Sequence, residues 1–376
     1  MEENTNFKKK KIFKYIIIVI LLVLVSIGAK ILVDIVTINN QMKNAETAIT
    51  INKDVHMYSS AKEKKKYENI ELGTDVYVLD RIIDDNGKLW CKVKVGKKVG
   101  YILSRDIGKY RADYGKKDLM LDVSKFNLEK NFSSINEFKA FVINNDIKFV
   151  YIRAGGRGYG KAGNFYTDSN ADEYAKACEF LKIPFGYYFL EEAINSDEVN
   201  EEVDFITEYL NNHKYSYNKL PLALDVEKHS ETGRADSIWD TRYNLINELT
   251  EKLQDKGNRV ILYSNAKLAN QYLNNVEAKM WLAYYPQVSE IPNYWYSDTS
   301  ADGANNIDMM SKMIGWQFTE NGTKNKIKEK VDLSIVYSNY LLNDSMEDVE
   351  NDIRERNEKI LAPVNKLIDI ISNILK

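Results

Sequence analysis

The stretch Pro221-Leu-Ala-Leu-Asp-Val-Glu227 decides how the rest of the chain is interpreted. Its apolar first half is typical of a buried strand in a parallel sheet. Residues two apart on a strand point to the same side, so Asp225 and Glu227 should lie together where the strand leaves the core. Two crowded acids raise each other's proton affinity, and a proton donor beside a negative charge suits cleavage of a glycosidic bond. The plainer alternative is an acidic pair that only ends a strand and caps the next helix.

The composition excludes several classes of protein. The chain has 376 residues, enough for two or three domains, and its net charge of -3 gives no sign of nucleic-acid binding. Cys91 and Cys178 are the only cysteines, there are three histidines, and no His-Glu-x-x-His occurs. These counts argue against a metallopeptidase and leave little material for a Cys-His or Ser-His-Asp nucleophile. We therefore expect no metal and no cofactor.

The N-terminus predicts a membrane segment. Residues 1–14 form a basic segment with five lysines after position 7, and residues 15–36 are apolar enough for a helix that crosses a bilayer of roughly 30 Å. The positive-inside rule places the N-terminus in the cytoplasm and the rest of the chain outside. A cleaved signal peptide is the alternative, since Ser26 and Gly28 offer a cleavage site, and the protein would then be secreted. Residues 37–46 are a polar linker.

Residues 47–110 predict a small all-β domain, because four short alternating runs are separated by turn residues. The runs are Ala48–Ile51, Val76–Leu79, Leu89–Val95 and Val99–Leu103. Their order resembles a bacterial SH3-like domain, on the stretches Glu71–Val78, Lys88–Val93 and Lys98–Ile102. The resemblance implies binding of peptidoglycan or other peptides; a spacer without a ligand is the alternative.

Residues 116–341 alternate between strand and helix patterns, which predicts an α/β barrel or an open doubly wound sheet. The predicted strands are Leu119–Asp122, Phe149–Arg153, Ile183–Leu190, Leu222–Asp225, Arg259–Tyr263, Met280–Tyr285, Met313–Phe318 and Lys330–Leu333. The predicted helices are Ser134–Asn144, Ala171–Leu181, Asp197–Asn211, Asp236–Gln254 and Ala266–Leu273. No Gly-x-Gly-x-x-Gly follows the first strand, so a dinucleotide fold is disfavoured.

Four acids fall at strand positions of this frame. Asp122 ends the first predicted strand, Asp225 and Glu227 end the fourth, and Asp332 lies in the eighth. In a closed barrel the first and eighth strands are neighbours, so all four carboxylates should converge on the C-terminal rim, where such barrels place their chemistry.

At these positions the region resembles a glycoside hydrolase family 25 muramidase, a lysozyme. The matching stretches are Leu121–Ser124, Tyr151–Gly155, Arg157–Lys161, Gly186–Phe189, Glu192–Asn195, Glu201–Phe205, Leu224–Glu227, Leu262–Asn265, Trp281–Tyr284, Trp316–Phe318 and Val331–Leu333. The resemblance implies a modified (β/α) barrel that hydrolyses the β-1,4 bond between N-acetylmuramic acid and N-acetylglucosamine. Retention or inversion at the anomeric carbon depends on carboxylate separation, which the sequence leaves open.

The resemblance also assigns roles to residues. It implies that Glu227 is the proton donor and Asp225 its companion, with Asp122 and Asp332 as further catalytic acids. It implies substrate contacts by Tyr188, Arg153, Trp281, Tyr284, Trp316 and Gln317. Phe189 departs from the pattern, since many members have histidine there. The stretches Asn305–Lys312 and Asn321–Lys330 look like loops of unusual length.

Residues 342–376 form a tail with apolar residues at helical spacing, which predicts a helix that packs on the barrel, binds a partner or touches a membrane. Taken together, the sequence predicts an exported hydrolase of peptidoglycan glycan strands, tethered to the cytoplasmic membrane. Tethering fits a local task, such as opening the wall for a secretion or conjugation assembly. The main alternative is a non-catalytic wall-binding or scaffold protein on the same fold.

Overall fold

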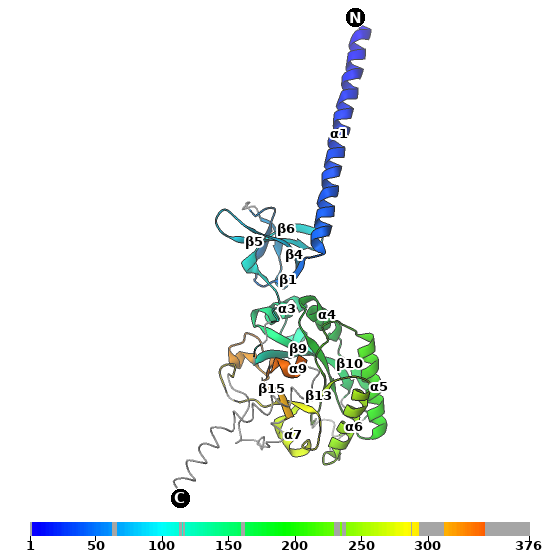
Figure 1. The fold of residues 1–376 in the computed structure, drawn as a ribbon, viewed down its shortest axis with the longest axis vertical. Helices are drawn as coiled ribbons and strands as arrows, with labels where there is room; N and C mark the ends of the chain where they lie inside the picture. The colour runs from blue at the N-terminus through cyan, green and yellow to red at the C-terminus, as the bar shows by residue number, and fades with distance from the viewer. Residues whose placement is uncertain are drawn as a thin grey trace. The chain divides into compact units, whose positions relative to one another are not determined.

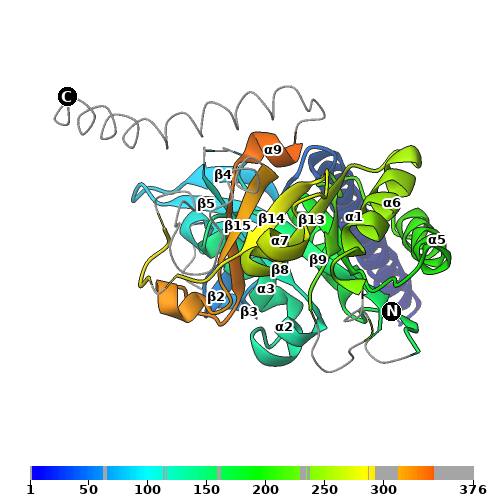
Figure 2. The same ribbon diagram turned by 90° about the horizontal axis from the view of Figure 1, so that it is seen from below.

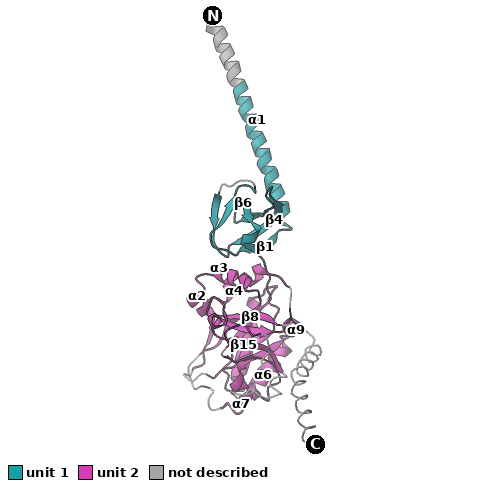
Figure 3. Cartoon of the chain, turned by 90° about the vertical axis from the view of Figure 1, so that its left-hand side faces the viewer, with its two compact units in different colours: residues 1–108 teal, residues 109–376 magenta. Residues whose placement is uncertain are grey.

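The computed structural model describes residues 2–61, 66–112, 115, 117–158, 162–228, 234, 238–286, 288–292 and 312–342; of residues 2–14 and of residue 339 it describes only the backbone. The chain divides into two compact units, residues 1–108 and residues 109–376 (Figure 3). The predicted loop Asn305–Lys312, apart from its last residue, and the predicted tail helix lie outside the described residues. So do parts of the lysine-rich stretch 61–66 and of the glycine-rich stretch 155–160.

The chain begins with one long helix, α1 (Glu2–Met42) (Figure 1). Its segment Tyr15–Met42 contains an 18-residue window with a mean hydropathy of 3.1, and the described residues bury none of that window. Its 28 residues would extend about 42 Å, longer than the roughly 30 Å hydrocarbon core of a bilayer. By length and composition this helix could be a membrane anchor or a signal sequence, so both alternatives from the sequence remain open.

The rest of the first unit is all β. Its strands are β1 (Glu46–Thr50), β2 (Val55–Tyr58), β3 (Lys66–Ile70), β4 (Asp75–Ile83), β5 (Leu89–Val95), β6 (Lys98–Leu103) and β7 (Ile107–Gly108). Within the described residues they form one antiparallel sheet in the order β3-β2-β6-β5-β4-β1-β7. Buried side chains of these strands, among them Met57, Val76 and Val93, form a small hydrophobic core. Each of the four predicted strand runs falls on a strand; the SH3-like assignment stays a prediction.

The second unit contains a closed barrel. Its strands are β8 (Asp118–Val123), β9 (Ile147–Arg157), β11 (Phe185–Leu190), β12 (Leu222–Asp225), β13 (Val260–Asn265), β14 (Lys279–Ala283), β15 (Met313–Thr319) and β16 (Asp332–Val336). They follow one another in the order β9-β11-β12-β13-β14-β15-β16-β8, and β8 pairs with β9 to close the ring. A short strand, β10 (Phe165–Thr167), joins the outside of β9. The predicted α/β barrel fold is therefore confirmed, in its closed form.

One strand runs against the predicted direction. The seven strands from β8 to β15 are parallel, whereas β16 is antiparallel to both of its neighbours. The reason lies in its connection: residues 320–331 contain only the short turn η3 (Gly322–Asn325) and no crossover helix, which a parallel neighbour requires. Asp332 therefore begins its strand instead of ending it, and the reversal brings it to the rim directly opposite Asp122.

The described helices of the second unit lie outside the barrel strands (Figure 2). They are α2 (Lys125–Lys130), α3 (Ile135–Asn144), α4 (Ala171–Leu181), α5 (Ser196–Asn212), α6 (Arg242–Asp255), α7 (Ala266–Tyr272) and α9 (Ser338–Leu342). All five predicted helices are present, although α6 begins at Arg242 and not at the predicted Asp236, which lies outside the described residues. Side-chain caps start three of them: Ser134 accepts from the amide of Glu137, Asn195 from that of Glu198, and Asn265 from those of Lys267 and Leu268.

The barrel interior is filled by side chains. Tyr151 stacks on Trp281 with ring centroids 5.0 Å apart, and Tyr263 packs edge-on against the same indole at 4.6 Å. Tyr340 and Leu341 of α9 belong to the same buried cluster. This end of the interior is therefore a packed core, and the polar side chains gather at the rim.

Candidate active site

A cavity of about 260 Å³ opens at the rim of the barrel. The described residues that line it are Asp122, Ser124, Arg153, Tyr166, Tyr188, Leu190, Asp225, Glu227, Tyr263, Trp281, Tyr285, Gln317, Glu320 and Asp332. The structure thus brings together all four predicted acids and four of the predicted substrate contacts. Of the predicted contacts, only Tyr284 and Trp316 do not line it.

The strand registers explain how the acids meet. Asp122 and Asp332 face each other across the antiparallel pair β8–β16. Asp225 is the last residue of β12, and Glu227 lies two positions further on. Between them Val226 is pinned to β13: its amide donates to the carbonyl of Tyr263 at 2.9 Å, and its carbonyl accepts from Ser264 Oγ at 2.8 Å. This fixed, fully buried valine keeps the two carboxyl groups on one side of the segment.

Burial dominates the electrostatics of these acids. It raises the pKa of Asp225 and Asp332 well above the usual range, with further raising by neighbouring acids, and Arg153 partly opposes it at Asp225. Burial also raises the pKa of Glu227. For Asp122, burial and then the nearby Glu227 raise the pKa to about 7, against a hydrogen bond that lowers it. The cluster therefore retains protons at a pH at which isolated carboxyl groups would be ionised.

Gln317 is the centre of a hydrogen-bond network beneath Asp122. The hydroxyls of Tyr263 and Tyr285 donate to its Oε1 at 2.7 and 2.6 Å, and its Nε2 donates to Asp122 Oδ2 at 2.9 Å. Because two donors occupy the amide oxygen, the amide nitrogen is held toward the carboxylate. The predicted substrate contact Gln317 thus makes a second interaction, with a catalytic candidate, that the sequence did not reveal.

Arg153 is fixed at the opposite wall. A β-bulge between β9 and β11 shifts the register directly after its pair with Tyr188. Its guanidinium forms an ion pair with Asp168 through Nη2 at 2.8 Å and Nε at 2.9 Å, and it lies 5.0 Å from the centroid of the Phe126 ring. Asp168 was not predicted, because its position three residues before α4 indicates only the start of a helix.

The predicted substrate contacts Trp281 and Trp316 have different hydrogen-bond partners. Trp281 is 2% exposed, and its indole nitrogen donates to Ser334 Oγ at 2.9 Å. Trp316 is fully buried and donates to the carbonyl of Tyr284 at 2.9 Å, which ties β15 to the segment after β14. The role of Tyr284 and Trp316 as substrate contacts stays a prediction. Sequence reasoning missed Tyr166, Tyr263, Tyr285 and Glu320; the place of Glu320, directly after a barrel strand, was a usable signal.

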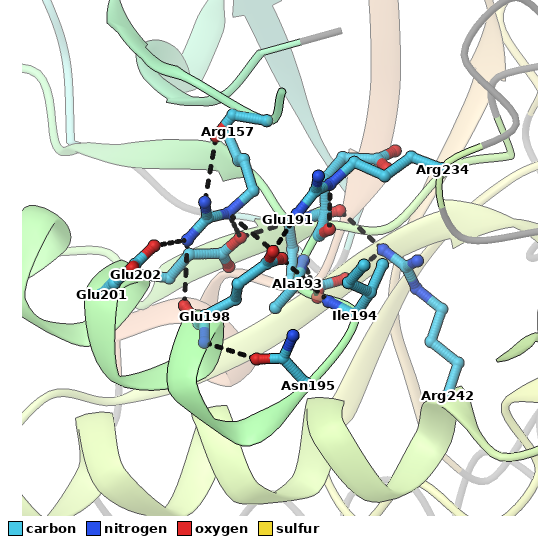
Figure 4. Close-up of polar contacts among 12 residues, drawn as sticks. Arg157, Glu191, Ala193, Ile194, Asn195, Glu198, Glu201, Glu202, Arg234 and Arg242 are labelled. Atoms are coloured by element: carbon cyan, nitrogen blue, oxygen red, sulfur yellow. Dashed lines mark hydrogen bonds and ion pairs between the residues drawn. The ribbon is translucent and has the colours of Figure 1, made fainter. Parts of the chain in front are cut away.

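A buried ionic network supports the segments around the site (Figure 4). The amide of Glu191 donates to the carbonyl of Asp225 at 3.0 Å, and its carboxylate pairs with Arg242 at 2.6 Å with both side chains fully buried. Arg157 pairs with Glu201 and Glu202 at 2.9 and 3.0 Å. Burial, with Glu191 nearby, raises the pKa of Glu202 to about 8, and Arg157 opposes that rise. The network joins the end of β9 and the segment after β11 to helices α5 and α6.

Arg234 extends this network. It is the one described residue between positions 229 and 237, its guanidinium pairs with Glu198, and its Nε donates to the carbonyl of Glu192 at 3.4 Å. Arg234 is thereby tied to the start of α5 and to the segment after β11. In the described parts of the chain, no group of three or more His, Cys, Asp or Glu side chains could hold a metal ion.

Comparisons with solved structures find likenesses of low identity. The chain is similar to the spore cortex lytic enzyme SleM of Clostridium perfringens, at 21% identity and a TM-score of 0.45 over 62% of this chain and 71% of that one. It is similar to the modular autolysin LytC of Streptococcus pneumoniae, at 20% and 0.42 over 77% of this chain and 58% of that one. The catalytic domain of endolysin ply40 from Listeria monocytogenes bacteriophage P40 gives 19% and 0.42 over 63% and 97%.

The family comparison covers more than half of the chain. No curated protein matches the sequence. The model of the family described as "Glycosyl hydrolases family 25" matches residues 121–327, from β8 to the turn before β16. This range contains Asp122, Asp225 and Glu227, and Asp332 lies just beyond it. The chain belongs to glycosyl hydrolases family 25.

Proposed function

We propose that this protein is a muramidase that hydrolyses the β-1,4 bond between N-acetylmuramic acid and N-acetylglucosamine in peptidoglycan. Membership of a family of glycosyl hydrolases supports hydrolysis of a glycosidic bond. The observation that carries the proposal is the cavity itself: Asp122, Asp225, Glu227 and Asp332 line one space of about 260 Å³, and the pKa of each is raised.

In this proposal Glu227 donates the proton to the leaving oxygen. It lies beyond the end of β12 and is half-buried, so it reaches the cavity and the surface beside it. Burial raises its pKa, so that the proton is retained toward neutral pH, as a general acid requires.

The other acids act on the sugar whose bond breaks. Asp122, whose pKa is raised to about 7, is partly ionised at neutral pH and places negative charge near the developing oxocarbenium ion. Asp332 faces it across the β8–β16 pair. Asp225 Oδ1 is buried and has no hydrogen-bond partner among the described residues, so it can accept the N–H of the sugar's N-acetyl group. Tyr188, Arg153 and Trp281 form the wall against which the ring lies. Carboxyl groups and water supply all of the proposed chemistry, which involves no cofactor.

Two features support a proposal for where the protein lies in the cell. They are the apolar helix and the resemblance of the β unit to an SH3-like domain. Residues 15–36 would anchor the protein with its N-terminus inside, a linker would follow over 37–46, residues 47–110 would form an SH3-like domain, and residues 116–341 would act on the wall. Fractionation of cells with an antibody to residues 116–341 tests this: recovery of full-length chain in the membrane supports an anchor, and a shortened chain in the medium supports a cleaved signal sequence.

Glu227→Gln tests the catalytic proposal. The variant keeps the size and hydrogen-bonding shape of the side chain but has no acidic proton, so general acid catalysis should be lost, on the order of 10²–10⁴-fold in rate. Purified peptidoglycan is digested, and the fragments are identified by mass spectrometry after reduction of their new ends. N-acetylmuramitol ends from the wild type, and none from Glu227→Gln with an unchanged thermal unfolding midpoint, are expected. A wild type that binds wall but releases no reduced ends would favour the non-catalytic alternative.

A further inference from the structure

A second cavity, of about 410 Å³, meets the active-site cavity at Glu227. Besides Glu227 it is lined by Lys228, Asn265, Lys267, Leu268, Gln271 and Tyr272. These residues come from the segment after β12, the end of β13 and helix α7. Apart from Glu227, none of these residues has a role in the proposed cleavage.

The two cavities differ in charge. Among the described residues that line the active-site cavity there are five acids, Asp122, Asp225, Glu227, Glu320 and Asp332, and one cation, Arg153, which is paired with Asp168. Among the described residues that line the second cavity, two are lysines and the only acid is the shared Glu227. A substrate that occupies both would therefore meet negative charge on one side of Glu227 and positive charge on the other.

The wall that carries the lysines is ordered by its own hydrogen bonds. Asn265 Oδ1 accepts from the amides of Lys267 and Leu268 at 2.9 and 3.4 Å, which fixes the backbone of Lys267 to the end of β13. Gln271 Nε2 donates to the Tyr272 hydroxyl at 2.8 Å, and the Tyr272 ring packs on Trp239 at 5.5 Å. Lys228 directly follows Glu227. The spacing between the proton donor and both lysines is therefore set by adjacent barrel strands.

The position of Glu227 tells which part of a substrate each cavity would receive. This step rests on the proposed function. A proton donor lies beside the bond that it cleaves, so cavities that meet at Glu227 lie on the two sides of that bond. The acidic cavity suits the sugar that becomes positively charged, and the lysine cavity then faces the leaving group. In the proposed cut the first sugar on the leaving-group side is N-acetylglucosamine. The sugar after it carries a lactyl side chain whose carboxyl group is either free or joined to a stem peptide that itself ends in carboxylates.

We propose that the lysine cavity is a subsite for a carboxylate carried by a muramyl side chain on the leaving-group side of the cut. Lysine suits this ligand, because it is a flexible point charge that can follow a mobile carboxylate without demanding a fixed geometry. The ligand class is shared by the lactyl group and by the stem peptide, and the substrates below separate the two.

The test compares three glycan substrates that have the same sugar chain. The first carries intact stem peptides, the second has every carboxyl group converted to a neutral amide, and the third has been stripped of its stems so that only lactyl carboxylates remain. The wild type should have the lowest kcat/KM on the amidated strand. Each exposed lysine–carboxylate pair should contribute roughly 1.4- to 5-fold. The preference should fall as salt rises from 50 to 500 mM, because screening weakens exposed pairs. Preference for the first over the third assigns the carboxylate to the stem. Preference for the third over the first assigns it to the lactyl group, because the amide bond to the stem removes the lactyl charge from the first strand.

Variants Lys228→Gln/Lys267→Gln and Lys228→Glu/Lys267→Glu are measured beside Lys176→Gln/Lys256→Gln, a control on helices α4 and α6. The readout is a ratio of two kcat/KM values. The first is measured on the charged strand that the wild type cleaves faster, and the second on the amidated strand. We expect the ratio to approach one in the first variant, to fall below one in the second and to stay at the wild-type value in the control. A ratio that is the same in all four proteins would overturn the subsite while leaving the muramidase proposal in place.

A binding assay tests the lysine subsite even if the protein does not cleave the glycan. The affinity of Glu227→Gln for short soluble glycans, with and without amidated carboxyl groups, is measured alone and combined with the lysine changes. If the wild type cleaves none of the strands, the muramidase proposal fails. Weaker binding of the amidated glycan, removed by Lys228→Gln/Lys267→Gln, would then still support the subsite, and binding that ignores both changes would overturn it.

Discussion

Replacement of Gln317 by leucine should shift the pH profile of the enzyme, because Gln317 controls the charge of Asp122. The pKa of Asp122 is raised to about 7 by burial and by Glu227, and the hydrogen bond from Gln317 is the main cause that lowers it. Leucine fills a similar volume but donates nothing. The pKa of Asp122 should therefore rise further in the variant.

The size of the effect follows from the strength of that bond. A hydrogen bond to a charged group is worth about 1.5–3 kcal/mol, which corresponds to roughly one to two pH units. At pH 7 the ionised fraction of Asp122 would fall from about one half to between about 10% and 1%. If ionised Asp122 stabilises the oxocarbenium ion, activity at pH 7 should fall by roughly 5- to 50-fold, and the acidic limb of the profile should move upward by the same one to two units.

The assay is kcat/KM on soluble glycan from pH 4 to 9, with Tyr263→Phe, Tyr285→Phe and their double variant as controls. Each single change leaves one hydroxyl to hold the Gln317 amide, so the limb should stay near its wild-type position; the double change should move it partway. A Gln317→Leu enzyme whose rate drops equally at every pH would refute the reasoning. Gln317 would then act only as a contact to the substrate.

Two further predictions concern stability. Arg242→Met leaves Glu191 as a buried charge without its cation, so calorimetry should show a loss of about 3–5 kcal/mol in the free energy of unfolding, or roughly 6–20 °C in the unfolding midpoint. The double variant Glu191→Leu/Arg242→Met should recover most of that stability. No recovery would contradict the ion-pair explanation. Asp122→Asn should stabilise the protein at pH 8. The folded pKa of Asp122 lies above its usual value, so stability is full below pH 4 and is lost as pH rises toward 7. Asparagine escapes that loss, which is on the order of 4 kcal/mol at most, and the two proteins should converge at pH 4 in denaturant titrations; a variant that is less stable at pH 8 would contradict it.

The buried network and the catalytic cavity show the same conflict between stability and function. In both, acidic side chains are buried: burial raises the pKa of Glu202 in the network, and it raises the pKa of all four predicted acids in the cavity. The network of Glu191 and Glu202 is neutralised by Arg242 and Arg157. The cavity has no such neutralisation for Asp122 and Asp332 among the described residues that line it, apart from Arg153 at a distance. The free-energy cost of burying acids without a cation therefore falls on the residues that the proposed reaction uses.

The sequence by itself determined the strands, the helices that cover them and the four acids. Apolar runs followed by polar residues mark barrel strands wherever both faces of a strand are buried, and the eight predicted strands are present for that reason. Asp225 and Glu227 could be paired from the period of a strand alone, because that period is a local property of the backbone.

Only the tertiary structure decided the direction of β16, the network around Gln317 and the ion pair between Arg153 and Asp168. Each joins residues far apart in the chain, such as Asp122 and Gln317, and no local periodicity carries that information. The second cavity beside Glu227 likewise exists only because β12 and β13 are neighbours in the closed barrel. Sequence pattern fixes which face of an element is buried, whereas side-chain partners depend on which elements pack together, and closure of the barrel sets that.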